Sequence, residues 1–255
     1  MKIIVLVKQT PDTTQLSGSM DGLALLAEDA PRVVNPWDEY ALETALQLKE
    51  THGGTVIALC AGPAGAVEAL RTAVAMGADE AVLLSDAALA QADTLGTARA
   101  LAAAVGKLGG ADLIVAGRTG IDGSSGATAV QVAGLLDIPA VCYVAALKEI
   151  DLAGKSLTAT RLLDSGRQVV QTHLPALITV VKEINEPRYP SFMGLRKAKK
   201  ADIPTWALAD IGLSAGQVAA QVAWQVSSPP ARATQLELFA NAAQLADRLV
   251  AEQLV

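Results

Sequence analysis

The glycine-rich segment 117–128 holds the residue types in this sequence that best suit chemistry. It contains four glycines and several small hydroxyl side chains, and it leads directly into a predicted helix over 128–136. Because a helix N-terminus concentrates unpaired N–H groups and positive potential, this pattern favours the binding of a phosphate group. Its glycines match neither the dinucleotide fingerprint nor the P-loop, so a glycine-tolerant loop after a strand remains an open interpretation of these residues alone.

Side chains that could act as nucleophiles, bases or metal ligands are sparse. His52, at a predicted helix end, and His173, in a predicted strand, stand apart from each other and are both interpreted as structural. The sequence has no Gly-x-Ser-x-Gly elbow, no metal-binding spacing, no close carboxylate pair and no Ser-Gly-Gly-x-Asp-Ser loop of the ATP pyrophosphatases. We therefore expect no catalytic and no metal-binding residue, and assign any reaction to a bound cofactor.

The segment 185–200 has the composition of a surface that binds another protein. Pro187 and Pro190 stiffen it, Phe192 and Met193 supply apolar side chains, and four cations follow close behind. An apolar anchor beside positive charge suits docking, because the anchor supplies affinity and the charges steer the approach. A plain surface loop that runs into a basic helix would have the same composition, so that alternative stays open here.

Strand-like and helix-like runs alternate up to about residue 145. Asn35 is expected to cap the first helix, and Pro36 to lie in its first turn. Strands are predicted over 3–7, 55–60, 80–84, 112–116 and 140–144, and helices over 36–49, 67–76, 93–108 and 128–136. This alternation predicts an α/β fold with a doubly wound, mostly parallel sheet.

A ligand site is expected at one edge of that sheet. Ligands of open parallel sheets bind outside the carboxyl ends of the strands. The segments 8–13, 35–38, 61–65 and 117–128 each follow a predicted strand or open a helix, so they are expected to meet there.

The pattern changes after residue 145. Residues 145–181 alternate around two turns, which predicts antiparallel strands added to the sheet, and their last part, the apolar run 176–181, indicates a buried strand. Apolar residues at helical spacing over 241–250 predict a last amphipathic helix, which could pack on a partner or cap its own domain.

Two domains are expected. The first is a nucleotide-binding α/β domain over 1–200 that includes the docking loop 185–200, and the second is a C-terminal arm over 201–255 that packs on a partner subunit.

Composition narrows the class of protein. The 255 residues are enough for one large domain or two small ones. The net charge of −6 disfavours nucleic-acid binding, and the basic residues 196–200 stand out against it. No apolar run approaches the roughly 20 residues of a membrane span. The N-terminal run 1–8 is too short for a signal peptide, so a cytoplasmic protein without membrane insertion is expected, with Cys60 and Cys142 as buried free thiols.

Many short motifs, in one order along nearly the whole chain, are similar to those of one family. They are Val7-Lys8-Gln9-Thr10-Pro11-Asp12-Thr13, Asn35-Pro36-x-x-Glu39-x-Ala41-x-Glu43-x-Ala45-x-x-Leu48-Lys49, Arg71-Thr72-Ala73-x-Ala75-Met76-Gly77-Ala78-Asp79, Gly117-Arg118-x-x-Ile121-Asp122, Ala133-Gly134-Leu135-Leu136-Asp137-x-Pro139, Arg161-x-x-Asp164-Ser165-Gly166-x-Gln168-x-Val170 with Pro175-Ala176-Leu177-Ile178-Thr179, and Asn185-Glu186-Pro187-Arg188-Tyr189 with Lys197-Ala198-Lys199-Lys200. On these motifs the chain resembles the beta subunit of electron-transfer flavoproteins, with Ser165 as an unusual residue in the signature.

The resemblance implies a heterodimer with an alpha subunit and a redox-active FAD at the joint between the two chains. It also implies a sheet of the adenine-nucleotide α-hydrolase-like type that buries an AMP without catalytic use. The residues expected to contact this nucleotide are Leu6, Asn35, Pro36, Trp37, Asp38, Ala61, Asp122, Gly123, Ser124, Ser125, Gly126, Ala127 and Thr128.

The resemblance further implies an electron carrier without catalytic side chains of its own. It would accept electrons from flavin dehydrogenases, such as the acyl-CoA dehydrogenases of fatty acid oxidation, and pass them to a membrane quinone oxidoreductase. Phe192 occupies the family's apolar anchor position, where many relatives have Leu. The expected docking residues are Glu186, Pro187, Arg188, Tyr189, Pro190, Ser191, Phe192, Met193, Gly194 and Leu195, with Lys197, Lys199 and Lys200 as steering charges.

Alternatives stay open beside this interpretation. Residues 9–13 and 121–123 look closer to a subgroup that carries a second FAD in place of AMP and splits electron pairs between two acceptors, whereas residues 124–127 fit neither version of the loop fully. AMP is the preferred interpretation. In another class, a stand-alone nucleotide-binding regulator of the universal-stress type would bind ATP without flavin, and an adenylating enzyme is disfavoured by the missing pyrophosphatase loop.

Overall fold

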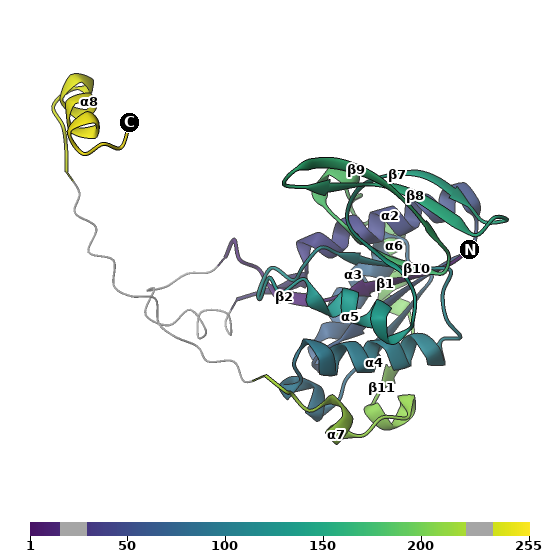
Figure 1. Cartoon of the computed structure of the whole chain (residues 1–255). Helices are drawn as coiled ribbons and strands as arrows, with labels where there is room; N and C mark the ends of the chain where they lie inside the picture. The colour runs from purple at the N-terminus through teal and green to yellow at the C-terminus, as the bar shows by residue number, and fades with distance from the viewer. Residues whose placement is uncertain (16–29, 223–236) are drawn as a thin grey trace.

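The computed structural model describes residues 1–15, 30–222 and 237–255 of the chain (Figure 1). The strands are β1 (Lys2–Val7), β2 (Gln9–Pro11), β3 (Arg32–Val34), β4 (Thr55–Ala61), β5 (Glu80–Leu84), β6 (Leu113–Gly117), β7 (Ala140–Asp151), β8 (Ser156–Leu163), β9 (Gly166–His173), β10 (Ala176–Val180) and β11 (Thr205–Trp206). The α-helices are α2 (Pro36–His52), α3 (Val67–Met76), α4 (Thr94–Lys107), α5 (Ala127–Leu135), α6 (Phe192–Lys200), α7 (Ala215–Val218) and α8 (Ala242–Ala251). Short 3₁₀ helices cover Ala64–Ala66, Ala87–Gln91, Lys182–Ile184 and Leu208–Ile211.

A nine-stranded sheet forms the centre of the molecule, in the order β11-β5-β4-β1-β6-β10-β7-β8-β9. Each neighbouring pair from β11 to β7 is parallel, and β8 and β9 add antiparallel strands at one edge. The expected α/β class, with a mostly parallel sheet and an antiparallel addition, is confirmed. The strands and helices predicted before residue 145 are all present.

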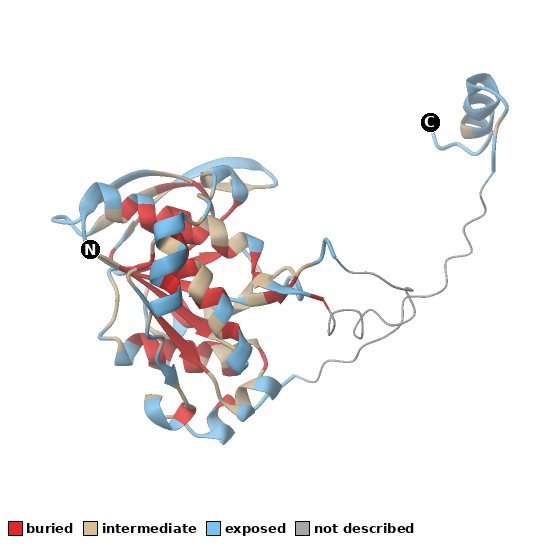
Figure 2. Ribbon diagram, turned by 180° about the vertical axis from the view of Figure 1, so that it is seen from behind, coloured by how far each residue is buried: buried red, intermediate tan, exposed pale blue. Residues whose placement is uncertain are grey.

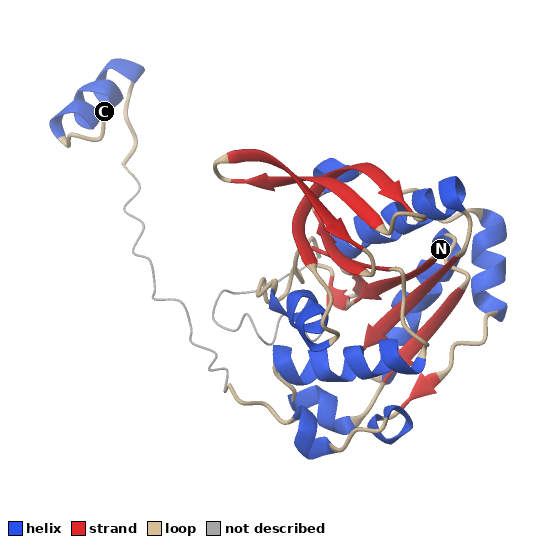
Figure 3. Ribbon diagram, turned by 45° about the vertical axis from the view of Figure 1, so that its right-hand side comes forward, coloured by secondary structure: helices blue, strands red, loops and turns tan. Residues whose placement is uncertain are grey.

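Helices cover both faces of the sheet (Figure 3). Successive residues of β1 point to opposite faces, so Ile3 and Val5 enter the core beneath α2, α3 and α6, whereas Ile4 and Leu6 enter the core beneath α4, α5 and α7. The buried residues gather along the strands and on the sheet-facing sides of these helices (Figure 2). The sheet therefore has one hydrophobic core on each face, as a doubly wound fold requires.

The position of β10 corrects the expectation for 145–181. This strand was predicted within an antiparallel group, but it lies between β6 and β7 and runs parallel to both. All five of its residues are buried. A strand covered on both faces needs a continuous apolar sequence, and that is the sequence of the run 176–180.

The boundary expected at residue 201 does not coincide with a change in packing. β11 pairs with β5, and Leu208 and Val218 are buried in the core beneath α4. Gly96 of α4 allows this contact, because a Cβ there would lie 2.2 Å from the carbonyl oxygen of Val218. The segment 201–222 therefore packs on the α/β body. Since α8 has no buried residue, an arm that packs on a partner stays a prediction for 237–255.

Cys60 is buried, as expected, whereas Cys142 is only half-buried, and both are free thiols. Within the described residues, none of the helices has the length and apolar character that crossing a membrane requires.

Candidate functional site

A cavity of about 600 Å³ lies at the carboxyl ends of the central strands. Its lining includes Leu6 from β1, Ala61 from β4 and Gly117 from β6. Each of the four segments expected to meet at this edge contributes at least one lining residue. A smaller hollow of about 420 Å³ lies beside Glu80, at the opposite end of β5.

Most of the expected nucleotide contacts line the cavity. The lining residues among them are Leu6, Asn35, Asp38, Ala61, Asp122, Gly123, Ser124, Ser125, Gly126, Ala127 and Thr128. Pro36 and Trp37 are not among the lining residues. Pro36 is an exposed first residue of α2, and the ring of Trp37 lies beneath Arg118, whose guanidinium carbon is 5.0 Å from the ring centroid.

Asn35 holds the glycine-rich segment against the start of α2. Its Oδ1 accepts a hydrogen bond from the amide of Ile121 at 3.1 Å, and its Nδ2 donates to the carbonyl of Thr119 at 2.9 Å. The side chain was expected to cap α2, but it makes no capping hydrogen bond. The partly buried backbone groups of the neighbouring loop satisfy its amide instead, and the side chain also hydrogen-bonds the carboxylate of Asp38.

Asp38 joins the ends of two strands beneath the cavity. Its carboxylate accepts hydrogen bonds from the amide of Lys8 at 2.7 Å and from the amide of Gly117 at 3.2 Å. The Lys8 ammonium in turn pairs with Asp122 at 2.7 Å, so the end of β1 is also tied to the glycine-rich segment. These contacts give the loop a fixed position relative to β1, α2 and β6.

Burial raises the pKa of Asp38 from 3.8 to about 7, although the amides of Lys8 and Gly117 favour its charged form. The folded state then binds a proton that the unfolded chain releases between these two values. Stability contributed by this proton is present at low pH and is lost as pH rises toward the folded pKa.

We predict that the free energy of unfolding falls by about 2 kcal/mol from this group between pH 5 and pH 7. Asp38→Asn should flatten that part of the profile, because the amide does not titrate. Urea unfolding of both proteins across this range measures the slope. Parallel profiles for the two proteins would contradict the assignment.

Two helix N-termini point toward the cavity. Thr94 and Thr97 from the first turn of α4, and Thr128 from the first turn of α5, line it. Gly126 precedes α5 in the left-handed conformation, at φ 60°, which glycine adopts without strain. The first amides of α5 have no carbonyl partner within the helix and no side-chain cap, so this end favours a negatively charged ligand, whereas the Asp93 carboxylate already accepts from the amide of Gly96 in the first turn of α4.

One side of the cavity was not predicted from the sequence. Helix α4 and the segment before it form this side. The lining residues from this side are Leu89, Ala90, Ala92, Asp93, Thr94, Thr97 and Leu101. Asp93 caps α4 by accepting a hydrogen bond from the amide of Gly96 at 2.8 Å. The sequence does contain a pattern that could have predicted this side. Asp93 and Thr94 mark the N-terminus of a predicted helix, and that helix follows strand β5.

The expected docking residues lie on a loop that becomes helix α6 at Phe192. Ser191 caps this helix by accepting from the amide of Gly194 at 2.9 Å. Tyr189, Phe192 and Met193 have 94%, 75% and 70% of their surface exposed. Among the expected docking residues, Glu186, Pro187 and Pro190 lie in the loop, and Leu195, Lys199 and Lys200 are exposed on α6.

The side chains of Arg188 and Lys197, both expected docking residues, contact other elements of the chain. Arg188 is paired with Glu43 and Glu50 of α2, and the Lys197 ammonium donates a hydrogen bond to the carbonyl of Ala78 at 3.2 Å. Their side chains therefore also hold the segment on the body of the protein.

The two histidines lie outside the cavity. Among the described residues that line it there is no histidine and no cysteine. His52 and His173 are both exposed, at the ends of α2 and β9. Throughout the three described ranges, no group of three or more His, Cys, Asp or Glu side chains could hold a metal ion.

Comparison with known proteins finds similarity to electron transfer flavoproteins. The model of the electron transfer flavoprotein domain matches residues 23–211. The chain is 42% identical over 198 residues to the electron transfer flavoprotein subunit beta of Thermoanaerobacterium thermosaccharolyticum, covering 78% of this chain and 75% of the relative. It is 42% identical over 215 residues to the caffeyl-CoA reductase-Etf complex subunit CarD of Acetobacterium woodii, covering 84% and 81%. It is 37% identical over 263 residues to protein FixA of Azorhizobium caulinodans, covering 99% and 93%.

Proposed function

The chain belongs to the electron transfer flavoprotein family as a beta subunit, and from this premise we propose that it pairs with an alpha subunit around a shared FAD. The heterodimer would carry electrons in the cytoplasm from flavin dehydrogenases, such as acyl-CoA dehydrogenases, to a membrane quinone oxidoreductase. Bound FAD would supply the electron transfer itself, and this chain would contribute binding surfaces and no catalytic side chain.

The observation that carries the proposal is the cavity at the carboxyl ends of β1, β4 and β6. It has room for a nucleotide, the open N-terminus of α5 that favours phosphate, and Lys8 and Arg118 as lining cations. We propose that the backbone of 123–128, at the N-terminus of α5, holds the phosphate of AMP. The hydrogen bonds of Asn35 and Asp38 would keep this cradle in shape.

The exposed end of α6 supports a docking role for the segment 185–200. An apolar ring that stays in water is unfavourable unless a partner covers it, and Phe192 begins the same helix that carries the exposed Lys199 and Lys200 in its last turn. One relative is a subunit of a caffeyl-CoA reductase-Etf complex, which supports an enzyme that acts on CoA thioesters as a partner.

Release of the cofactors from the purified heterodimer tests the proposal. We expect one FAD and one AMP for each pair of chains after denaturation, because the proposal assigns AMP to the cavity of this chain and FAD to the joint with the alpha subunit. Chromatography of the released nucleotides gives the count.

Other counts would select the alternatives. Two FAD and no AMP would identify the subgroup that splits electron pairs, in which a second FAD replaces AMP. ATP without flavin, released from a monomer or homodimer of this chain, would contradict the proposal and favour a stand-alone regulator.

A further inference from the structure

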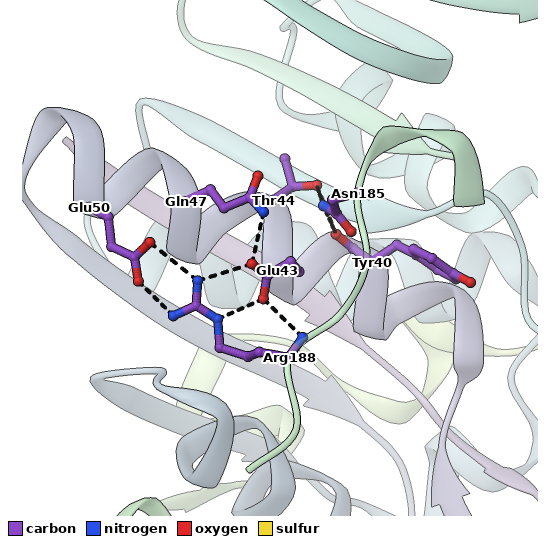
Figure 4. Close-up of polar contacts among 7 residues, drawn as sticks. All are labelled: Tyr40, Glu43, Thr44, Gln47, Glu50, Asn185 and Arg188. Atoms are coloured by element: carbon purple, nitrogen blue, oxygen red, sulfur yellow. Dashed lines mark hydrogen bonds and ion pairs between the residues drawn. The ribbon is translucent and has the colours of Figure 1, made fainter. Parts of the chain in front are cut away.

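Arg188 forms a polar cluster with two glutamates on the surface of α2 (Figure 4). Its Nε donates to Glu43 Oε2 at 2.7 Å and its Nη1 donates to Glu50 Oε1 at 2.6 Å. Its Nη2 reaches both carboxylates, at 3.0 Å and 3.2 Å, and its backbone amide also donates to Glu43 at 3.2 Å. We refer to Arg188, Glu43 and Glu50 as the Arg188 cluster.

The cluster stays charged under physiological conditions. The Glu43 side chain is only 5% exposed, and burial alone would raise its pKa. The hydrogen bonds from Arg188 and Gln47 outweigh burial and lower the pKa below the ordinary value of 4.5. A planar guanidinium between two carboxylates gives a defined geometry, which a single ammonium would not.

A second side chain of the same loop, Asn185, contacts α2 beside Glu43 and one turn before it. Asn185 Nδ2 donates to the Thr44 hydroxyl at 2.8 Å and to the carbonyl of Tyr40 at 3.1 Å (Figure 4). Tyr40, Thr44 and the glutamates of the cluster lie on one face of α2, because residues three, four and seven apart share a face. The start of the docking segment is therefore fixed along one helix.

The other side of Phe192 is fixed on α3. Gly194 lies so close that a Cβ there would be 2.0 Å from the carbonyl oxygen of Ala75. Arg71 Nη1 donates to the carbonyl of Ala198 at 2.7 Å, near the end of α6. Phe192 thus stands between two anchored points, four residues after Arg188 and two before Gly194.

We propose that Arg188 is a positioning residue that fixes the loop before α6 against α2, so that the exposed ring of Phe192 meets a partner dehydrogenase without first being ordered. This inference rests on the proposed docking function. A preorganised anchor binds more tightly, because the loss of loop freedom does not oppose association. The N-terminal end of the same helix carries Asn35 and Asp38, so α2 also sets the distance between the docking segment and the cavity.

The test uses the purified heterodimer and an acyl-CoA dehydrogenase as electron donor. In Arg188→Met with Glu43→Met, both partners of the buried pair are replaced, so no carboxylate stays buried and unpaired and the fold is retained. We expect the apparent KM for the dehydrogenase to rise about tenfold, with kcat unchanged, and amide hydrogen exchange over 186–195 to accelerate about tenfold. Arg167→Met on β9 removes an exposed arginine as the matched control and should change neither quantity.

Combining the double substitution with Phe192→Ala shows whether the Arg188 cluster positions Phe192 or only stabilises the fold. If the Arg188 cluster acts through Phe192, adding the double substitution to Phe192→Ala should raise KM less than about twofold further. Fully additive effects, or unchanged exchange over 186–195, would overturn the inference while the docking function stands. No effect of Phe192→Ala alone would overturn the docking function, and the inference with it.

Discussion

Gly117→Ala is expected to destabilise the protein by about 3 kcal/mol and to abolish stoichiometric binding of the nucleotide. The added Cβ would lie 2.5 Å from Asp38 Oδ1 and 2.6 Å from the carbonyl carbon of Trp37. Both contacts are shorter than atoms tolerate, and Gly117 is buried at the end of β6, so the start of α2 must move. That movement would break the hydrogen bond from the Gly117 amide to Asp38 and displace the cavity wall.

The measurements for Gly117→Ala are urea unfolding and the AMP or FAD content after denaturation. Gly134→Ala in α5 is the matched control, because a Cβ there meets nothing within 4 Å. It should leave nucleotide content unchanged and stabilise the helix by up to about 1 kcal/mol. Wild-type stability and nucleotide content in Gly117→Ala would show that the backbones of β6 and α2 do not approach as closely as described.

Phe192→Ala is expected to lower kcat/KM for an acyl-CoA dehydrogenase about thirtyfold, which corresponds to about 2 kcal/mol of binding free energy. The ring is 75% exposed in the free chain, so its removal costs little folding stability. Its burial in a partner would supply a large part of the association energy, as aromatic anchors do at interface centres. Stopped-flow reduction of the heterodimer by the dehydrogenase measures the rate.

Val169→Ala on β9 is the control for Phe192→Ala, since Val169 is also exposed, at 63%, but lies outside the docking segment. It should leave the transfer rate unchanged. If both substitutions lower the rate equally, the effect belongs to exposed apolar surface in general. If neither does, the partner docks elsewhere.

Local sequence patterns predicted much of the fold. Apolar β-branched runs such as 3–7 became strands, and Pro36 and Gly53 mark the start and end of α2, because proline fits a first turn and a glycine at φ 69° ends a helix. The glycine-rich segment 117–128 was also predictable as one wall of the site, since each glycine and the following helix start are features of a few consecutive residues. Such signals act over one or two turns of chain, so they can be recognised without knowing the rest of the molecule.

Contacts between distant residues could not be predicted in this way. Arg188 and Glu43 are 145 positions apart, so the resemblance placed Arg188 among the docking residues, whereas the folded chain pairs it with Glu43 of α2. The apolar sequence of β10 predicted burial but not its place between β6 and β7, and no local pattern placed Val218 against Gly96. Residue types set what each short segment can form, whereas the partner of a buried charge or strand depends on which surfaces meet when the whole sheet is assembled.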